Sequence, residues 1–555
     1  MRSDEYHSQK YIPEGACVAP VIISTDKTQL TQFSGGKLAY PVYLTLGNIP
    51  RAMRRKPSQS ACILIAYLSV NKDVGEGLTH KQKSARIQQL FHDSMRLVLD
   101  PLVQAGKWGM EVTGGDGMVR LVCPVLACYV ADYPEQCLVS CAKYGTCPRC
   151  LSRALGHRGP GPPHTQKETS TIISNACGSA SSETHFQQLC KEELVSGGVR
   201  RPFWEGFPLC DIHVCITPDV LHQLYQGVVK HMIDWCSSLI DDEELDSRVR
   251  GLPPCFGLRH FKGGWSHLSQ ISGKERKDMA CILLGCLVGK VPSEIITCYR
   301  ALLDFIYLAQ YSTHDDDTLQ YLENSLNLFH EHKNVLVELG IREHLDIPKF
   351  HSMLHYAEAI RNFGTTDNYN TEMFERFHID MAKEGWRASN FKNEVPQMTS
   401  WLTRQEKVSL FQSYIQNATT DDDRNAIPPS SIPALPGVGL AISQRPAVRN
   451  QSISSIQNTH HAPSFSLHLR EYLNSILPRG DSIPRSQLAN AQLPFDRLDV
   501  WHTCKFSLDV LGNDVDGEEG VDAVKAKPGR AGEARFDTVL VAHQDLAETT
   551  GLQGA

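Results

Sequence analysis

The chain has 555 residues, with 55 lysines and arginines against 62 aspartates and glutamates, so its formal net charge is −7. A hydrophobic content of 41 % excludes a wholly disordered chain, and the sequence has neither a run of about 18 apolar residues nor an apolar N-terminal signal. The 18 cysteines therefore favour reduced thiols and metal ligands over a disulfide framework, in a soluble intracellular protein of several parts.

The N-terminal part of the chain predicts a β-rich unit with one long helix. Apolar runs bounded by polar and turn residues predict strands, and they lie at 17–23, 40–46, 62–70 and 119–130. Residues 82–105 have apolar side chains at helical spacing and predict an amphipathic helix. The segment 151–200 is rich in Gly, Pro, Ser and Thr, which predicts a mobile loop.

Helical patterns dominate from residue 218 to about residue 417. Residues 420–500 are rich in Pro, Ser and Asn and predict a linker with one short helix near 465–477. The last 55 residues hold five basic and ten acidic residues and one strand-like run at 536–542. Strands followed by a helical block favour an α/β protein over an all-β enzyme or a solenoid.

Two acidic residues follow predicted strands: Asp26 comes just after the first, and Asp132 comes at the end of the last. Carboxylates at strand ends can converge at one edge of a sheet, where divalent cations bind through oxygen ligands. A third acid is available in Glu375 or Glu372, which lie three residues apart on a predicted helix and can face the same side. The alternative is that each acid is a solvated turn or helix-surface residue.

Cys147 and Cys150 form a CxxC pair, whose spacing suits two thiolates on one tetrahedral zinc ion. Two buried thiols are the alternative, because other cysteines lie close by. His351 and His355 are separated by one helical turn, so they can project together and supply the other two ligands. Such a Cys2His2 site would hold the loop after the second acid and the helix before the third acid in register.

The sequence Thr217-Pro218-Asp219 predicts a helix start, with Thr217 as N-cap and Pro218 in the first helical position. The helix dipole is a sufficient reason for an acid in this first turn. Asp219 and His222 are nevertheless a second candidate for a metal or DNA site.

The densest basic cluster comprises Arg51, Arg54, Arg55 and Lys56, which follow Pro50 in a predicted turn. The cluster is consistent with a solvated loop, with a weak nuclear-import signal, or with contacts to nucleic-acid phosphates, which need clustered Lys and Arg. The chain has no phosphate-binding P-loop and no dinucleotide-binding fingerprint.

Several long segments closely resemble the Plavaka transposases of fungal genomes, which are similar to CACTA-type DDE transposases. These segments are STDKTQLTQFSGGKLAYPVYLTLGNIPRAMRRKPS, ADYPEQCLVSCAKYGTCPRC, DIHVCITPDVLHQLYQGVVKH, IPKFHSMLHYAEAIRNFGTTDNYNTEMFERFHID and WRASNFKNEVPQMTSWLTRQEKV. The resemblance covers about residues 10–415. It implies an α/β protein with a ribonuclease-H-like catalytic core, interrupted by a large all-helical insertion and followed by a disordered linker and a small β-rich tail.

The resemblance also implies roles for the candidate residues. Asp26, Asp132 and Glu375 match the three acids of the DDE set, with Asp219 and Glu372 as rivals. The CxxC and HxxxH pairs resemble the zinc-binding pairs of the superfamily, and the basic loop would hold DNA phosphates. The implied chemistry is phosphoryl transfer with two Mg²⁺ or Mn²⁺ ions, which cuts transposon ends and joins them to target DNA. A homodimer, nuclear localisation and no membrane association are expected.

The first half of the implied core, with the CxxC, spans residues 1–150 and is followed by a mobile insert at 151–217. The helical insertion spans 218–348, and the helical return to the core spans 349–417. A linker at 418–500 and an acidic tail at 501–555 complete the chain. The chain begins only 25 residues before Asp26, where such transposases usually carry a DNA-reading module, so truncation at both ends is expected. The alternatives are an inactive or domesticated remnant that acts as a DNA- or partner-binding scaffold, and a metal-dependent nuclease or hydrolase with a structural zinc.

Overall fold

The computed structural model separates into two compact units, which end and begin at Ser413 and Tyr414. It describes residues 12–13, 15–31, 36–114, 117–153, 155–156, 158–255, 258–422, 438–442, 446–475, 477, 483–508, 521–527 and 535–536. No helix among these residues is both long enough and apolar enough to cross a membrane.

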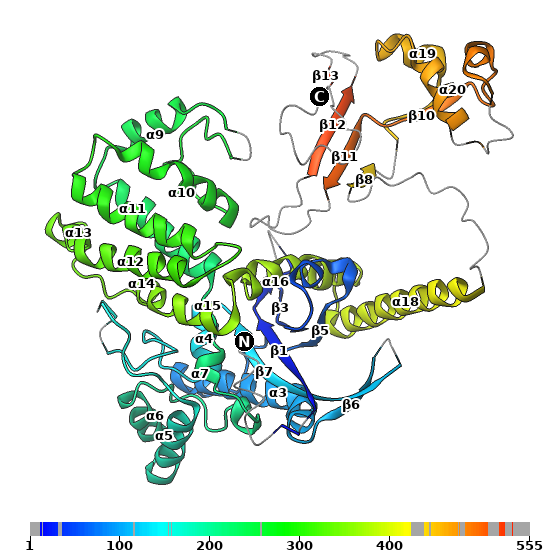
Figure 1. Cartoon of the computed structure of the whole chain (residues 1–555). Coiled ribbons are helices and arrows are strands. Elements are labelled where there is room, and N and C mark those ends of the chain that lie inside the picture. The colour runs from blue at the N-terminus through cyan, green and yellow to red at the C-terminus, as the bar shows by residue number, and fades with distance from the viewer. Residues whose placement is uncertain are drawn as a thin grey trace. The chain divides into compact units, whose positions relative to one another are not determined.

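The first unit is built on a curled five-stranded sheet with the strand order β5-β4-β1-β7-β6 (Figure 1). The strands are β1 (Cys17–Thr25), β4 (Pro41–Leu46), β5 (Cys62–Tyr67), β6 (Met110–Thr113) and β7 (Val119–Val130). Strands β1 and β7 are parallel, and the other neighbours are antiparallel. The four predicted strands are confirmed, and β6 was missed because its four residues carry no clear alternation.

The register places Ser24 of β1 opposite Val130 of β7, so these two parallel strands end side by side. Residues that follow β1 and β7 therefore leave the sheet at the same edge. A further short pair, β2 (Thr28–Gln29) with β3 (Leu38–Ala39), lies between β1 and β4 in sequence.

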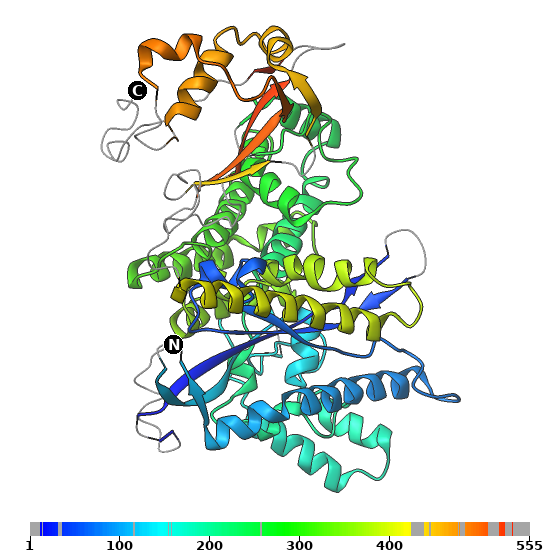
Figure 2. The ribbon, with the colours of Figure 1, turned by 90° about the vertical axis from the view of Figure 1, so that its right-hand side faces the viewer.

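Helices cover both faces of this sheet, and Figure 2 shows blue α3 on one side and yellow-green helices on the other. Helix α3 (His80–Trp108) confirms the helix predicted at 82–105 and begins with a capping box at Thr79. Its buried Met95 packs with Ile23 and Tyr129 of the sheet. The opposite face packs Ile22 and Ala127 against Phe374 of α16 (Thr371–Phe377). Alternate residues of one strand thus reach separate cores.

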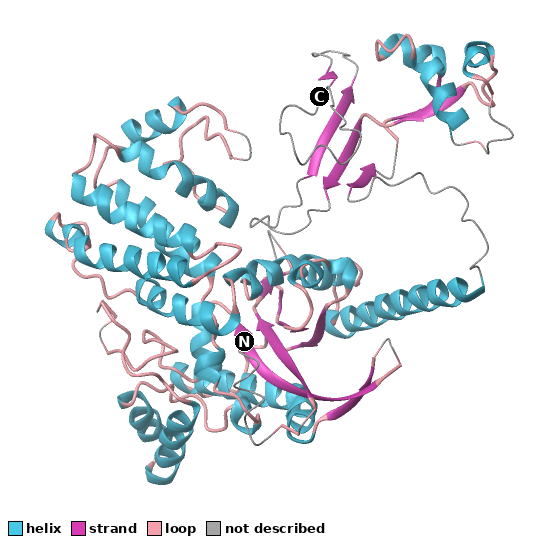
Figure 3. Ribbon diagram, in the orientation of Figure 1, coloured by secondary structure: helices cyan, strands magenta, loops and turns pink. Residues whose placement is uncertain are grey.

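The predicted helical block is present (Figure 3) and encloses a core of its own, which includes Met232, Tyr299, Phe305 and Phe329. Its helices are α8 (Lys230–Cys236), α9 (Asp242–Gly251), α10 (Gly273–Leu287), α11 (Ser293–Leu308), α12 (Asp316–His332), α13 (Val335–Glu338), α14 (Pro348–Ser352) and α15 (Tyr356–Phe363). Two π-helices flank this block in sequence, η3 (Val220–Val229) and η6 (His378–Lys383).

Shorter elements connect these parts. They are α2 (Arg51–Arg54), α4 (Tyr133–Ser140), α7 (Ile212–Cys215), α17 (Glu384–Arg387) and the 3₁₀ helices η1 (Pro57–Gln59), η2 (Phe203–Gly206), η4 (Met353–His355) and η5 (Thr366–Asn368). The turn predicted for the basic cluster is in fact the single helical turn α2.

The loop predicted for 151–200 was wrong for many of its residues, because two helices form there, α5 (Gln166–Ser179) and α6 (Glu183–Glu192). Some of the Thr and Ser residues that indicated a loop are the N-caps of these helices. The Thr165 side chain accepts from the Glu168 backbone N–H, and the Ser182 side chain accepts from the His185 backbone N–H. Both helices then bury apolar side chains in the core that α3 covers.

The second unit contains β8 (Val438–Ile442), β9 (Val448–Ser452), α19 (Ile453–Thr459), α20 (Phe465–Ser475), η7 (Arg485–Asn490), β10 (Arg497–Val500), β11 (Thr503–Leu508), β12 (Val521–Lys527) and β13 (Arg535–Phe536), and α18 (Glu394–Asp422) spans the boundary. The strands form two sheets, β13-β12-β11-β8 and β10-β9. The helix predicted near 465–477 is confirmed. A disordered linker was wrong for the described part of 420–500, because β9 pairs with a strand that follows more than 40 residues later. Of the strand predicted at 536–542, all but Phe536 lies outside the described residues.

Candidate functional site

The acids predicted at the strand ends lie at one edge of the sheet, since Asp26 directly follows β1 and Asp132 comes two residues after β7. Asp132 is the N-cap of α4, where its Oδ1 accepts from the Glu135 backbone N–H at 3.0 Å. Glu375, on α16, comes 243 residues after Asp132 in the sequence and lies beside both acids in the fold. All three line one small pocket of ≈ 10 Å³.

Two histidines line the same pocket and contact its acids. His378 Nε2 lies 3.5 Å from Asp26 Oδ2, and His222 Nε2 lies 3.3 Å from Glu375 Oε1. His378 was missed by the sequence analysis, although it comes three residues after Glu375 and so falls on the same helix face. Among the described residues the acids do not bring three ligand atoms within 4.8 Å of one another, whereas the Cys/His group does.

The electrostatics of the pocket leave His222 charged. Burial opposes its protonation, but the neighbouring carboxylates of Asp219 and Glu375 outweigh burial and raise the pKa of His222 to about 11. Burial also raises the pKa of Asp132, with a further contribution from the charge of Asp26 and an opposing one from the Glu135 backbone. A cation placed among these carboxylates would relieve their mutual repulsion.

Neither of the rival acids lines the acidic pocket itself. Asp219 is 1 % exposed, accepts from Thr371 Oγ1 at 2.7 Å and holds His222 Nδ1 at 2.6 Å, so it joins η3 to α16 through two residues that line the pocket. Glu372 pairs with Lys277 at 2.7 Å and lines a neighbouring groove of ≈ 470 Å³. That groove shares His222 and Glu375 with the acidic pocket, so the two hollows adjoin.

Each of the two histidines belongs to a π-helix: His222 lies in the first turn of η3, and His378 is the first residue of η6. Such helices are rare and occur often at functional sites, because the wider turn redirects side chains. Both segments lie in the described part of the chain on opposite sides of the helical block in sequence. The helical block is therefore joined to the acidic pocket at both of its ends.

Glu135 is a buried acid that the sequence analysis missed. Its carboxylate accepts from Thr25 Oγ1 at 2.6 Å and from the Tyr40 hydroxyl, and it lies one turn after Asp132. Burial raises the pKa of Glu135 to about 7, although both hydrogen bonds act in the opposite direction. These bonds fix the end of β1 to the start of α4, and so fix the two strand-end acids relative to each other.

The predicted cysteine and histidine pairs come together at a second place, as a group that could bind a metal ion. The ligand atoms of Cys147, Cys150, His351 and His355 all lie within 4.8 Å of one another. The Sγ of Cys147 is 3.2 Å from Nε2 of His355, and the Sγ of Cys150 is 3.2 Å from Nε2 of His351. Zinc bonds of the usual length at tetrahedral angles would place sulfur and nitrogen about 3.5 Å apart. All four residues are buried.

The chemistry of the donors fits this purpose. Burial lowers the pKa of His355, which keeps it neutral, and a hydrogen bond from Cys147 together with the two imidazoles holds the pKa of Cys150 well below its usual value. The Arg149 backbone N–H donates to Cys147 Sγ at 3.4 Å, and His213 Nδ1 contacts the Pro148 carbonyl at 2.7 Å. The loop is therefore held in the shape in which both sulfurs point to one centre.

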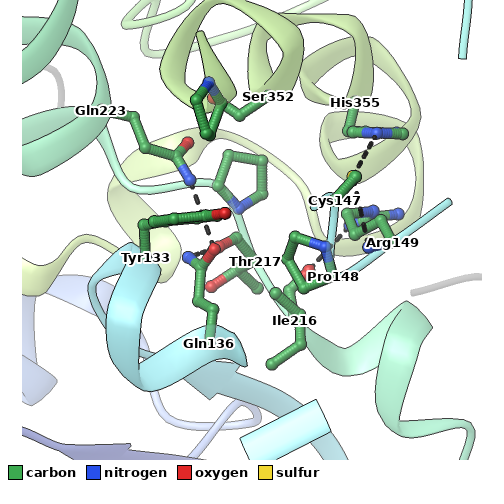
Figure 4. A pocket seen from close by; sticks show the side chains of 12 residues that line it. Tyr133, Gln136, Cys147, Pro148, Arg149, Ile216, Thr217, Gln223, Ser352 and His355 are labelled. Atoms are coloured by element: carbon green, nitrogen blue, oxygen red, sulfur yellow. Dashed lines mark hydrogen bonds between the residues drawn. The ribbon is translucent and has the colours of Figure 1, made fainter. Parts of the chain in front are cut away.

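A cavity of ≈ 20 Å³ separates this group from a chain of buried amides. Figure 4 shows His355 beside Cys147 at one side and Gln223 facing Gln136 at the other. Gln136 Nε2 donates to the Thr217 carbonyl at 2.9 Å, and Gln223 Nε2 donates to Gln136 Oε1 at 3.3 Å. These amides join α4, which begins after Asp132, to η3, which carries His222.

The basic cluster is partly internal. Arg54 is 2 % exposed and donates to the carbonyls of Ile49 and Asn368, at 3.0 and 2.9 Å. Arg51 pairs with Asp367. Arg54 therefore has no surface to offer a phosphate and instead attaches α2 to the segment before α16, whereas Arg55 and Lys56 are half-buried.

Fold and site together define a mixed α/β protein with a curled sheet, a pocket of carboxylates and histidines, and a buried Cys/His group able to hold a metal ion. Residues 1–236 match the family model described as Plavaka transposase, so this part of the chain is similar to a Plavaka transposase domain. A comparison with curated proteins gave no match. Glu375, His351 and His355 follow the matched segment, and the fold brings them to residues within it.

Proposed function

We propose that the protein is a DDE-type transposase, or derives from one, and that Asp26, Asp132 and Glu375 are its catalytic carboxylates. The observation that carries the proposal is their convergence: acids from two adjacent parallel strands and from a distant helix line one pocket. Hard oxygen ligands of this kind suit Mg²⁺ or Mn²⁺. When bound, two such ions supply activation of water or a DNA 3′-hydroxyl and stabilisation of the leaving oxygen.

The sheet supports the ribonuclease-H-like core that the resemblance implies. Antiparallel strands β5, β4 and β1 are followed by α3 and by β7, which lies parallel to β1. The helical block lies between β7 and α16 in sequence and has its own apolar core, which supports its interpretation as an insertion. We further infer that the Cys/His group holds a structural Zn²⁺ that ties the segment after α4 to the segment before α16.

The chain's own residues would act on the DNA strand at this edge. Lys274 and Arg376 line the adjoining groove, where their charges would attract phosphates toward Glu375. His222 is positioned by Asp219 to donate from Nε2 toward the same carboxylate or toward a phosphate oxygen beside it. DNA would thus be the partner and the nucleus the place of action, with a homodimer as the assembly implied by the resemblance.

A second candidate function is a catalytically inactive remnant that binds DNA or a partner as a scaffold. Two observations favour it: Asp26 and Glu375 are paired with His378 and His222, and the acids of the pocket do not form a group of three ligand atoms within 4.8 Å among the described residues. Both candidates retain the Cys/His group, because its role is structural in either case.

Cleavage of DNA by the purified full chain separates these two functions. Supercoiled plasmid would be incubated with Mg²⁺ or Mn²⁺, and nicking compared between the wild type and Asp26→Asn, Asp132→Asn and Glu375→Gln. Removal of one group that stabilises the transition state electrostatically costs about 10²-fold or more in rate, so each variant should nick more slowly by at least about that factor. Asp317→Asn, at an exposed position on α12, is the control and should cleave like the wild type. Equal nicking by all variants would refute the acid assignment. Absence of nicking by the wild type would favour the second candidate function, the inactive scaffold.

A further inference from the structure

A strongly basic groove shares no lining residue with the acidic pocket, and none of the family-based expectations includes it. We call it the cationic groove; it is lined by Lys81, Lys143, Arg153, Thr184, Gln187, Gln188, Lys191 and Glu192, and its volume is ≈ 520 Å³. Four cations thus face one hollow with a single acid, in a chain whose net charge is −7. The local charge runs against the charge of the whole molecule.

The groove is formed by three separate elements that internal contacts hold in place. Helix α6 supplies one wall, Lys81 comes from the first turn of α3, and Lys143 and Arg153 lie on either side of the CxxC. The Lys143 backbone donates to the Leu194 carbonyl at 2.8 Å, and Arg153 Nη2 donates to the Glu192 carbonyl at 3.1 Å. The cations therefore converge because the backbone is fixed, not because one sequence motif is basic.

The folded chain does not use the charges of the three lysines. Within the residues that the structure describes, Lys81, Lys143 and Lys191 form no ion pair with a carboxylate. The one acid at the rim, Glu192, accepts from Gln188 Nε2 at 3.0 Å. Lys81 is also unfavourable for its own helix, because a cation in the first turn opposes the helix dipole. A ligand of opposite charge would account for this arrangement.

The lining identifies the class of that ligand. Every side chain that lines the groove is polar, so there is no apolar pocket for a peptide side chain and no aromatic ring on which an unpaired base could stack. Lys, Arg, Gln and Thr are the side chains that hold phosphate oxygens of a duplex without reading its sequence. Cations from three elements suit a row of phosphates better than one small anion.

We propose that the cationic groove binds the phosphate backbone of duplex DNA, at a place distinct from the acidic pocket and independent of DNA sequence. The choice of DNA among polyanions rests on the proposed function. The groove would hold the duplex by charge, while cleavage depends on separate residues at the sheet edge. Because Lys143 and Arg153 flank the CxxC, the Cys/His group also fixes two of the groove's cations.

The test measures binding of a fluorescent duplex of arbitrary sequence to the full-length chain by anisotropy, without added divalent cations, at several salt concentrations. The triple variant Lys81→Gln, Lys143→Gln, Lys191→Gln should bind at least about tenfold more weakly at low salt. Its plot of log affinity against log salt should be shallower by about 2.7, since each lost phosphate contact removes about 0.9. The triple variant Lys107→Gln, Lys262→Gln, Lys392→Gln changes the net charge equally at exposed positions outside the groove and should match the wild type.

A single variant separates a binding role from a structural role. Lys81→Glu places an acid where the dipole of α3 favours it, so the melting temperature should stay the same or rise while DNA binding weakens. Affinities and slopes of the groove variants that equal those of the control would overturn the proposal. Displacement of the duplex by polyglutamate as efficiently as by unlabelled duplex would also overturn it. Asp26→Asn should keep full binding, so failure of the catalytic proposal and failure of the groove are distinguishable.

Discussion

Replacement of Cys147 and Cys150 by serine removes two of the four ligands from the buried Cys/His group and should destabilise the first unit. Without the ion, the side chains of His351 and His355, 1 % and 5 % exposed, lose their common partner in a site closed to water. His351 Nδ1 is also buried and has no hydrogen-bond partner within the described residues, so this imidazole has little else to hold it.

The expected cost is about 4 kcal/mol, the range in which loss of a metal site falls. At ~2 °C per kcal/mol for a large unit, the melting temperature should fall by about 8 °C. The measurement is thermal unfolding of the wild type and the double variant, with zinc content determined on the same samples. The wild type should carry one zinc ion per chain and the double variant none.

Cys17→Ser together with Cys255→Ser is the matched control, since both thiols are exposed and lie outside the group. This control should keep its zinc and its melting temperature. A wild type purified without zinc, or a CxxC double variant that melts like the control, would refute the reasoning. A chelator that lowers the melting temperature of the wild type and leaves that of the double variant unchanged would support it independently.

Three further perturbations test the contacts that place the site. Phe374→Ala empties a buried position between α16 and the sheet and should cost about 3–5 kcal/mol in denaturant unfolding, whereas exposed Phe411→Ala should cost little; equal costs would contradict the packing. Gly197→Ala would bring its Cβ to 2.4 Å from the Cα of Gln187 and should destabilise by about 1–3 kcal/mol. Gly178→Ala, with open space around it in α5, should be neutral or stabilising, and the reverse order of their melting temperatures would refute the close approach. The pKa of His222 is near 6.5 in the unfolded chain and about 11 in the folded chain, so its ion pair stabilises the fold fully below pH 6.5. This stabilisation declines as the pH rises from 6.5 toward about 11. Asp219→Asn should flatten that part of the pH–stability curve, and an unchanged curve would show that the pair contributes nothing.

Particular residues show where sequence reasoning fails and why. Arg54 looks like a surface cation because its neighbours are basic, yet its guanidinium is satisfied by carbonyls, one of them on Asn368, 314 residues away. Thr165 and Ser182 look like loop residues, and only the burial of the helices that follow them makes them N-caps. Strand β9 lies in a Pro/Ser/Asn-rich segment and acquires its structure from β10. In each case the deciding partner is distant, so no local pattern contains it.

The amino-acid sequence by itself determined the main strands of the first sheet, the helical block, and the residue types at the site. Strand periodicity, a CxxC pair and a one-turn histidine pair are local, and local rules are sufficient to read them. Only the tertiary structure decided which acids share a pocket, that His222 and His378 lie among them, and that four cations from three elements form the cationic groove. The physical reason is that the parallel register of β1 with β7 and the packing of α16 on the sheet bring distant residues together, and these long-range contacts are set by the folded core as a whole.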